Sequence, residues 1–309
     1  MRILVTGGAG YLGSVLVPRL LARHDVTVLD NFIHGENTLS QCCADPGFDV
    51  VKGDARDMRI VEPLAKCADA VIPLAAIVGF PACLMDQDAA KTTNYHAIAN
   101  LCGLLSPSQM VIYPTTNSGY GTTNGEDYCT EDTPLKPISL YGKTKSDAER
   151  VVLERENSVT LRLATAFGAS PRMRIDLLLN EFVYRAVLDK SIVIFEGHFK
   201  RNFIHVRDIA SAFLHAIDKF PDMRGRPFNC GLSSANMTKI ELCERIQKHA
   251  PKFVYVESEI GTDPDKRNYL VSNDRIEATG FMPSRSIDDG IIELIKLYAT
   301  IKNNRYGNV

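Results

Sequence analysis

Short apolar runs rich in β-branched residues recur through the first half of the chain, and stretches of helical periodicity separate them. The runs span residues 2–7, 25–30, 48–54, 70–76, 110–116 and 159–164, and the clearest helical stretches span 11–23, 88–105 and 141–156. Strands that alternate with helices build right-handed βαβ units, and therefore a parallel sheet covered on both faces. The pattern predicts an α/β fold with a doubly wound parallel sheet.

The second half of the chain is less regular. Residues 191–195, 202–206 and 227–231 read as strands, and 207–220 reads as a helix that returns to the sheet. We therefore expect a first domain over residues 1–168, to which 191–219 returns. A smaller interleaved C-terminal domain over 169–309 is expected to bind the substrate.

Composition and charge exclude several classes of protein. The formal net charge of −2 gives no reason to bind polyanions, so we expect no nucleic-acid partner. No apolar run is long enough to cross a membrane, and the chain opens directly on a strand-like run. We therefore expect no membrane partner and a cytoplasmic location. The eight cysteines form no CxxC pair and the seven histidines are scattered, so we expect no metal site and reduced thiols.

The segment VTGGAGYLGS places Gly7, Gly10 and Gly13 between the first strand and the first helix. Such a turn needs unusual backbone angles, and a pyrophosphate needs to approach the backbone without a Cβ in the way. Asp30 ends the second strand, 17 residues beyond Gly13. A carboxylate there accepts hydrogen bonds from the adenosine ribose and repels a 2′-phosphate. The sequence therefore predicts a dinucleotide cofactor, NAD rather than NADP.

Tyr141 and Lys145 are four residues apart in YGKTK and project from one face of a helix. A phenol with an ordinary pKa near 10 is a poor base at neutral pH. A nearby ammonium and the positive nicotinamide ring favour the phenolate, so we expect a lowered pKa for Tyr141. The tyrosine can then take a proton from a sugar hydroxyl while hydride leaves the same carbon.

The GxxGxxG spacing together with YGKTK resembles the extended short-chain dehydrogenase/reductase family, which contains the nucleotide-sugar epimerases and dehydratases, and the resemblance covers nearly the whole chain. It implies a Rossmann fold, a nucleotide-sugar substrate and a homodimer formed through the helices around 88–105 and 141–156. It also implies that Asp54 contacts adenine, that Leu74, Ala75 and Ala76 lie along the cofactor, and that Asn94 supports the strand beneath the nicotinamide. The expected NAD-binding set is Gly7, Gly10, Tyr11, Leu12, Gly13, Asp30, Asn31, Asp54, Ala55, Leu74, Ala75, Ala76, Asn94, Tyr141 and Lys145.

The stretch PTTNSGYG aligns by its YG with the active-site strand of this family. Thr116 then falls where relatives carry the Ser or Thr that bonds the reacting oxygen, and Thr115 would replace it if the register slipped by one. Dehydratases follow this residue with Asp-Glu, an acid and a base that expel water, whereas this chain has Asn117 and Ser118. Since neither can replace the acid or the base, dehydration is disfavoured.

The resemblance also implies residues that bind the nucleotide-sugar. Arg201 aligns with an arginine that holds the substrate pyrophosphate, as a planar fork suits paired phosphate oxygens. Thr165 replaces an Asn that many relatives place near the diphosphate. The expected substrate-binding set is Thr116, Asn117, Ser118, Thr165, Arg172, Arg174, Arg201 and Arg267.

Three functions stay open at this stage. The phrases IYPTTNSGYG, RLATAFGASPRMR and DPDKRNYLVSN resemble GDP-D-glycero-α-D-manno-heptose 4-dehydrogenases of capsular polysaccharide pathways, which implies a GDP-sugar substrate. A nucleotide-sugar 4-epimerase, acting on a UDP- or GDP-hexose, needs the same residues and returns the hydride. A non-catalytic dinucleotide-binding scaffold is disfavoured by Thr116, Tyr141 and Lys145.

Overall fold

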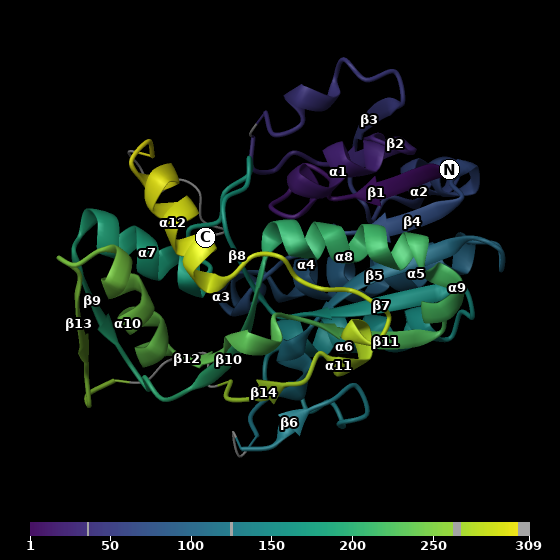
Figure 1. The fold of residues 1–309 in the computed structure, drawn as a ribbon. Helices are drawn as coiled ribbons and strands as arrows, with labels where there is room; N and C mark the ends of the chain where they lie inside the picture. Colours follow the sequence, from purple (N-terminus) through teal and green to yellow (C-terminus); the bar gives the residue numbers. More distant parts are fainter. Residues whose placement is uncertain (36, 124–125, 262–266, 302–309) are drawn as a thin grey trace.

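A large parallel sheet forms the centre of the molecule (Figure 1). The computed structural model describes residues 1–35, 37–123, 126–261 and 267–301. Within them the sheet has seven strands in the order β11-β7-β5-β4-β1-β2-β3. The strands are β1 (Arg2–Thr6), β2 (Asp25–Asp30), β3 (Phe48–Lys52), β4 (Ala70–Pro73), β5 (Met110–Thr116), β7 (Ser158–Leu163) and β11 (Arg226–Cys230). The predicted doubly wound α/β fold is confirmed.

Helices cover both faces of the sheet, which explains why its strands are almost continuously apolar. In β1, Ile3 and Val5 point into a core shared with α1 (Gly13–Leu21) and α8 (Val206–Asp218). Leu4 points the opposite way, into a second core with α2 (Met58–Cys67), α5 (Ala97–Leu104) and α6 (Leu140–Leu153). Alternate residues of one strand therefore hold two helical layers, as the period of two requires.

A smaller region lies at the left of Figure 1 and is built around two small sheets. One contains β8 (Thr165–Phe167), β10 (Lys200–His205) and β12 (Asn236–Thr238), and the other pairs β9 (Ser191–Ile194) with β13 (Val254–Glu257). Helix α7 (Leu178–Leu188) packs against α10 (Lys239–His249) and α12 (Ile287–Tyr298).

Short elements connect these parts. They are η1 (Ser40–Cys42), α3 (Phe80–Met85), α4 (Gln87–Lys91), the π-helical turn η2 (Thr92–His96), η3 (Asn117–Tyr120), β6 (Tyr128–Cys129), α9 (Phe220–Met223), η4 (Ser233–Ala235), β14 (Leu270–Val271) and α11 (Asp274–Glu277). β6 pairs in parallel with β14, so the loop after β5 is tied to a segment near residue 270.

The chain returns to the large sheet later than the sequence suggests. We expected residues 191–219 to return, but β9 and β10 lie in the small sheets and only α8 packs on the large one, beside α1. The last strand of the large sheet is β11, which pairs in parallel with β7. The reason is that α8 serves as the crossover that precedes β11. The division into two domains stays a prediction.

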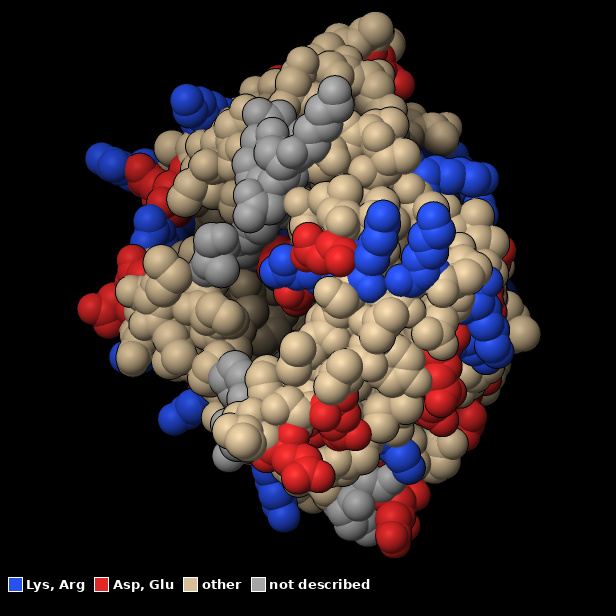
Figure 2. Space-filling model, turned by 90° about the vertical axis from the view of Figure 1, so that its left-hand side faces the viewer, with Lys and Arg blue, Asp and Glu red and all other residues tan. Residues whose placement is uncertain are grey.

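Charged side chains of both signs are interspersed on the face shown in Figure 2. No helix among the described residues is long and apolar enough to span a membrane. On α5 and α6, Ile98, Leu101 and Val152 are buried within the chain itself. These positions therefore serve the chain's own core, and the homodimer stays a prediction.

Candidate active site

A cleft of about 760 Å³ opens at the carboxyl ends of the parallel strands, where ligands bind in doubly wound sheets. We use "cofactor end" for the part lined by Gly7–Gly13, Asp30 and Asp54, and "sugar end" for the part lined by Thr165, Arg174 and Arg267. Tyr141 and Lys145 also line the cleft. Residues at the ends of strands between β1 and β8, together with Arg267, thus line one cleft.

The glycine turn fits a dinucleotide because it leaves no room for side chains. Gly7 has a φ of 74°, and a Cβ on it would lie 2.5 Å from the backbone nitrogen of Ala75. A Cβ on Gly13 would lie 2.4 Å from the carbonyl oxygen of Gly8, so helix α1 starts in close contact with the turn. The backbone at the end of β1 is therefore open to a pyrophosphate, next to the amides of a helix N-terminus.

Acidic residues follow the glycine turn along the cofactor end. The two oxygens of Asp30 accept hydrogen bonds from the amides of Ala9 (2.9 Å) and Phe32 (2.8 Å), which fixes the carboxylate at the end of β2. Asp54 also lines the cleft, but its carboxylate is paired with Arg56 at 2.6 Å. The bond from Arg56 lowers the pKa of Asp54. Arg56 lines the cleft as well, and sequence reasoning had not singled it out.

The predicted floor, Leu74 to Ala76, lines the cleft, whereas Asn94 lies behind it. Asn94 is buried in the π-helical turn η2 and bonds both the amide (2.8 Å) and the carbonyl (2.9 Å) of Ile77. Such turns are rare and are frequent at functional sites. Asn94 therefore holds the backbone next to the floor rather than facing the cleft itself.

Thr116 ends β5 and faces Tyr141. Its hydroxyl donates to the Ser118 hydroxyl at 2.9 Å and accepts from the Ser118 amide at 3.1 Å. Thr116 also acts to lower the pKa of Tyr141. Thr115 is buried and its hydroxyl has no hydrogen-bond partner among the described residues. Both threonines line the cleft, and the register with Thr116 as the active-site hydroxyl stays a prediction.

Asn117 and Ser118 occupy the two positions after this threonine. Ser118 lines the cleft, whereas Asn117 is buried and does not line it among the described residues. Arg267 donates a hydrogen bond to the Ser118 hydroxyl. The structure thus offers an amide and a hydroxyl here and no carboxylate.

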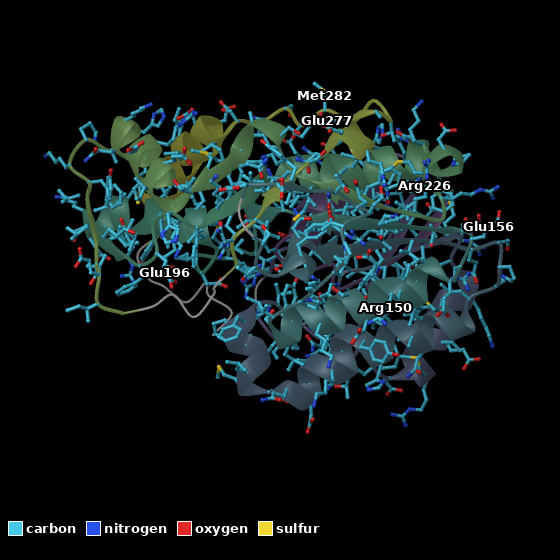
Figure 3. All side chains as sticks on the ribbon, turned by 90° about the horizontal axis from the view of Figure 1, so that it is seen from below. Arg150, Glu156, Glu196, Arg226, Glu277 and Met282 are labelled. Carbon is cyan, nitrogen blue, oxygen red and sulfur yellow. The ribbon has the colours of Figure 1, made fainter. Side chains whose placement is uncertain are left out.

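Helix α6 presents Tyr141 and Lys145 to the cleft. Ser139 caps the helix by accepting the Gly142 amide at 3.1 Å, which places Tyr141 in the first turn. Lys145 is buried, and its ammonium lies 4.0 Å from the centre of the Tyr113 ring. Arg150 of the same helix lies on the outer face (Figure 3). The two predicted catalytic side chains therefore share the inner face of α6.

Burial raises the pKa of Tyr141 to about 12 in the protein alone, and Arg174, Arg267 and Thr116 only partly oppose this rise. The expected lowering depended also on the charge of the nicotinamide ring, so it stays a prediction. Burial also lowers the pKa of Lys145 to about 7, against the influence of Glu149. A buried lysine is a weaker source of positive charge than the spacing suggested, because burial disfavours its charged form.

Sequence reasoning missed the ion pair beneath Lys145. Glu149 lies one helical turn further along α6 and is bonded by Arg162 of β7 at 2.8 Å, with both side chains buried. The guanidinium of Arg162 also donates to the Tyr120 hydroxyl at 3.0 Å. The YxxxKxxxE spacing could have pointed to Glu149, whereas its partner Arg162 is brought close only by the fold.

The predicted substrate residues separate in space. Thr165, Arg174 and Arg267 line the sugar end, and Tyr269, which the sequence did not single out, lies beside them. Arg201 is buried with its guanidinium 5.8 Å from the Tyr269 ring and does not line the cleft among the described residues. The described residues contain no group of His, Cys, Asp and Glu that could hold a metal ion.

Curated relatives match nearly the whole chain at low identity. The low-salt glycan biosynthesis protein Agl12 of Haloferax volcanii is 27% identical, over 96% of this chain and 98% of its own length. UDP-glucuronic acid decarboxylase 2 of Arabidopsis thaliana is 28% identical, over 96% of this chain and 68% of its own length.

Solved structures share the fold. The UDP-glucuronic acid 4-epimerase of Bacillus cereus, in complex with UDP-glucuronic acid and NAD, has a TM-score of 0.85 at 23% identity and covers 97% of this chain and 99% of its own. The dTDP-glucose 4,6-dehydratase of Bacillus anthracis has a TM-score of 0.82 at 22% identity, over 99% and 98% of the two chains. The model of the NAD dependent epimerase/dehydratase family matches residues 3–231. The chain belongs to this family, and its cofactor is NAD.

Proposed function

We propose that the protein oxidises a nucleotide-sugar at C4 to the 4-keto sugar. The observation that carries this proposal is the meeting of Thr116, Tyr141 and Lys145 in one cleft with the dinucleotide turn. NAD, when bound, accepts the hydride. The side chains of the protein accept the hydroxyl proton and hydrogen-bond the oxygen that becomes the ketone.

Each of the three side chains has a distinct task. Tyr141 takes the proton of the C4 hydroxyl, and Thr116 donates a hydrogen bond to the oxygen that becomes the ketone. Lys145 bonds the nicotinamide ribose and adds positive charge near the phenol. Arg174 and Arg267 lower the pKa of Tyr141 from the sugar end. These five side chains together support removal of the proton from the C4 hydroxyl.

Asn117 and Ser118 support oxidation without loss of water. A dehydratase needs an acid to protonate the leaving hydroxide and a base to remove the neighbouring proton. An amide and a hydroxyl perform neither task at neutral pH. The absence of carboxylates at these two positions favours a reaction that stops at, or passes through, the ketone.

The leading candidate is a GDP-D-glycero-α-D-manno-heptose 4-dehydrogenase in surface polysaccharide biosynthesis. It is supported by the resemblance of the phrases around Thr116, Arg172 and Arg267. The similarity to a glycan biosynthesis protein of Haloferax volcanii agrees with a role in making surface sugars. A cytoplasmic homodimer is part of this proposal.

A 4-epimerase is the second candidate. It is supported by the solved 4-epimerases with this fold, one with UDP-glucuronic acid and one with UDP-N-acetylmuramic acid. An epimerase makes the same ketone, turns it within the cleft and returns the hydride. Both candidates therefore use the same residues.

Product analysis across GDP- and UDP-sugars separates the two candidates. The leading candidate predicts a 4-keto sugar from GDP-manno-heptose and one reduced cofactor for each ketone formed, measured by mass spectrometry and absorbance. Inversion at C4 without an accumulating ketone would establish the epimerase. Loss of water from any sugar would contradict the proposed roles of Asn117 and Ser118.

A further inference from the structure

Residues 168–174 run across the glycine turn and are fastened to it. The Tyr11 hydroxyl donates to the carbonyl of Gly168 at 2.7 Å, and the Ser170 hydroxyl donates to the carbonyl of Tyr11 at 2.7 Å. The hydroxyls of Ser14 and Ser170 lie 2.9 Å apart. All of these contacts are buried, so the segment after β8 is held in a fixed position beside the start of α1.

This fixed segment carries Arg172, whose side chain is only 2% exposed and lines the cleft. Its backbone amide lies 3.4 Å from the Ser14 hydroxyl, in the first turn of α1. One terminal nitrogen donates to the carbonyl of Met173 at 2.7 Å, and the other lies 2.8 Å from Nδ1 of His34. Arg172 is thus a buried cation at the cofactor end, although its neighbour Arg174 lines the sugar end.

His34 reaches Arg172 from the loop that follows β2. This loop is fixed at both ends, because Asp30 accepts the Phe32 amide at 2.8 Å and the Thr38 hydroxyl donates to the Ala9 carbonyl at 2.9 Å. Burial and the charge of Arg172 lower the pKa of His34, which favours the neutral ring as an acceptor. The contact between the two side chains therefore joins the β2 loop to residues 168–174 across the cleft.

The start of α1 has no acidic capping side chain among the described residues. No side chain in the described part of the chain caps this helix, and no acidic residue lies in its first turn. A helix N-terminus attracts an anion, and a guanidinium bonds phosphate oxygens in pairs. The backbone of Arg172 lies next to the uncapped helix, and its buried guanidinium lines the same cleft as the glycine turn.

We propose that Arg172 binds the pyrophosphate of NAD and that His34 holds Arg172 in position for it. This assigns Arg172 to the cofactor, whereas the sequence placed it among the substrate arginines. The assignment does not depend on which sugar is oxidised or on whether the hydride returns. His34 is a positioning residue, since it acts through Arg172.

Release of NAD from the full-length purified protein tests this assignment without any sugar. Arg172→Met is expected to weaken NAD retention by about 10- to 100-fold, the usual effect of losing a hydrogen bond to a charged group. Arg172→Lys keeps the positive charge but loses the planar guanidinium, so its NAD retention should lie between that of the wild type and that of Arg172→Met. The measurement is the NAD that remains bound per chain after timed dialysis, together with the dissociation rate.

Two further variants keep the test decisive. His34→Ala changes an exposed loop residue, so it should fold even if Arg172→Met does not, and should speed NAD release about threefold. His96→Ala, an exposed histidine outside the cleft, is the matched control and should leave release unchanged. Unchanged release in His34→Ala would overturn the positioning role. Unchanged release in a folded Arg172→Met, with a raised KM for the nucleotide-sugar, would return Arg172 to the substrate.

Discussion

The two ends of the cleft are built in different ways. At the cofactor end, main-chain atoms of Gly7 and Ala75 and the fixed carboxylate of Asp30 come from successive strands of one sheet. At the sugar end, the side chains of Arg174 and Arg267 reach in from loops nearly a hundred residues apart. Main-chain geometry tolerates little change, whereas long side chains can be exchanged without altering the fold. We therefore expect cofactor binding to depend on the fold itself and sugar binding to depend on these arginine side chains.

The largest expected effect is at Tyr141, where the two ends meet. Tyr141→Phe removes the proton acceptor and should lower the rate of sugar oxidation by about 10²- to 10⁴-fold, while bound NAD is retained. Single-turnover reduction of NAD measures this. Tyr128→Phe, at a tyrosine that is 57% exposed, is the control. Unchanged oxidation would remove Tyr141 from the mechanism.

The second-largest effect is expected from a variant at the cofactor end. Gly7→Ala puts a Cβ against the backbone of Ala75 at a positive φ, so we expect NAD to bind roughly 100-fold more weakly, by equilibrium dialysis. Gly103→Ala in α5 is the matched control, because a Cβ there meets nothing within 4 Å. If Gly7→Ala bound NAD as tightly as Gly103→Ala, the glycine turn would tolerate a side chain and the cofactor end would not be rigid there.

A sugar-end variant should be milder and should depend on pH. Among the charges near Tyr141, Arg174 comes first in lowering the pKa of the phenol. Arg174→Gln raises that pKa further, so less phenolate exists at a given pH. We expect kcat to fall about tenfold, and the fall to persist until the pH approaches the pKa of the phenol. Arg150→Gln, on the outer face of α6, should leave kcat unchanged (Figure 3). A rise in KM with an unchanged kcat would show that Arg174 acts only by binding.

The smallest expected effect concerns stability at the buried lysine. The pKa of Lys145 falls from 10.5 to about 7 because burial disfavours its charge. The cost of that charge is complete below pH 7 and declines as the pH rises from 7 toward 10.5. Lys145→Met should therefore raise the Tm by roughly 2–4 °C at pH 6 and by less at pH 9. An equal rise at both pH values would mean that the pKa of Lys145 does not differ between the folded and the unfolded protein.

Local patterns were enough for the cofactor end. Gly7 and Asp30 were predicted because a turn without room for a Cβ and a carboxylate ending the next strand are local requirements. Local patterns did not place Arg201, whose guanidinium lies 5.8 Å from the Tyr269 ring, and its role at the substrate pyrophosphate stays a prediction. They also did not reveal the burial that raises the pKa of Tyr141, because spacing along a helix does not report burial.

The sequence by itself determined the alternation of strands and helices, the dinucleotide turn and the pairing of Tyr141 with Lys145 on one helical face. Each of these features depends on residues that are close together along the chain. Only the tertiary structure decided that β11 completes the sheet, that Glu149 meets Arg162, and that Arg172 meets His34. The reason is physical: burial and contacts between distant segments arise when the layers pack, and both change what a charged side chain can do.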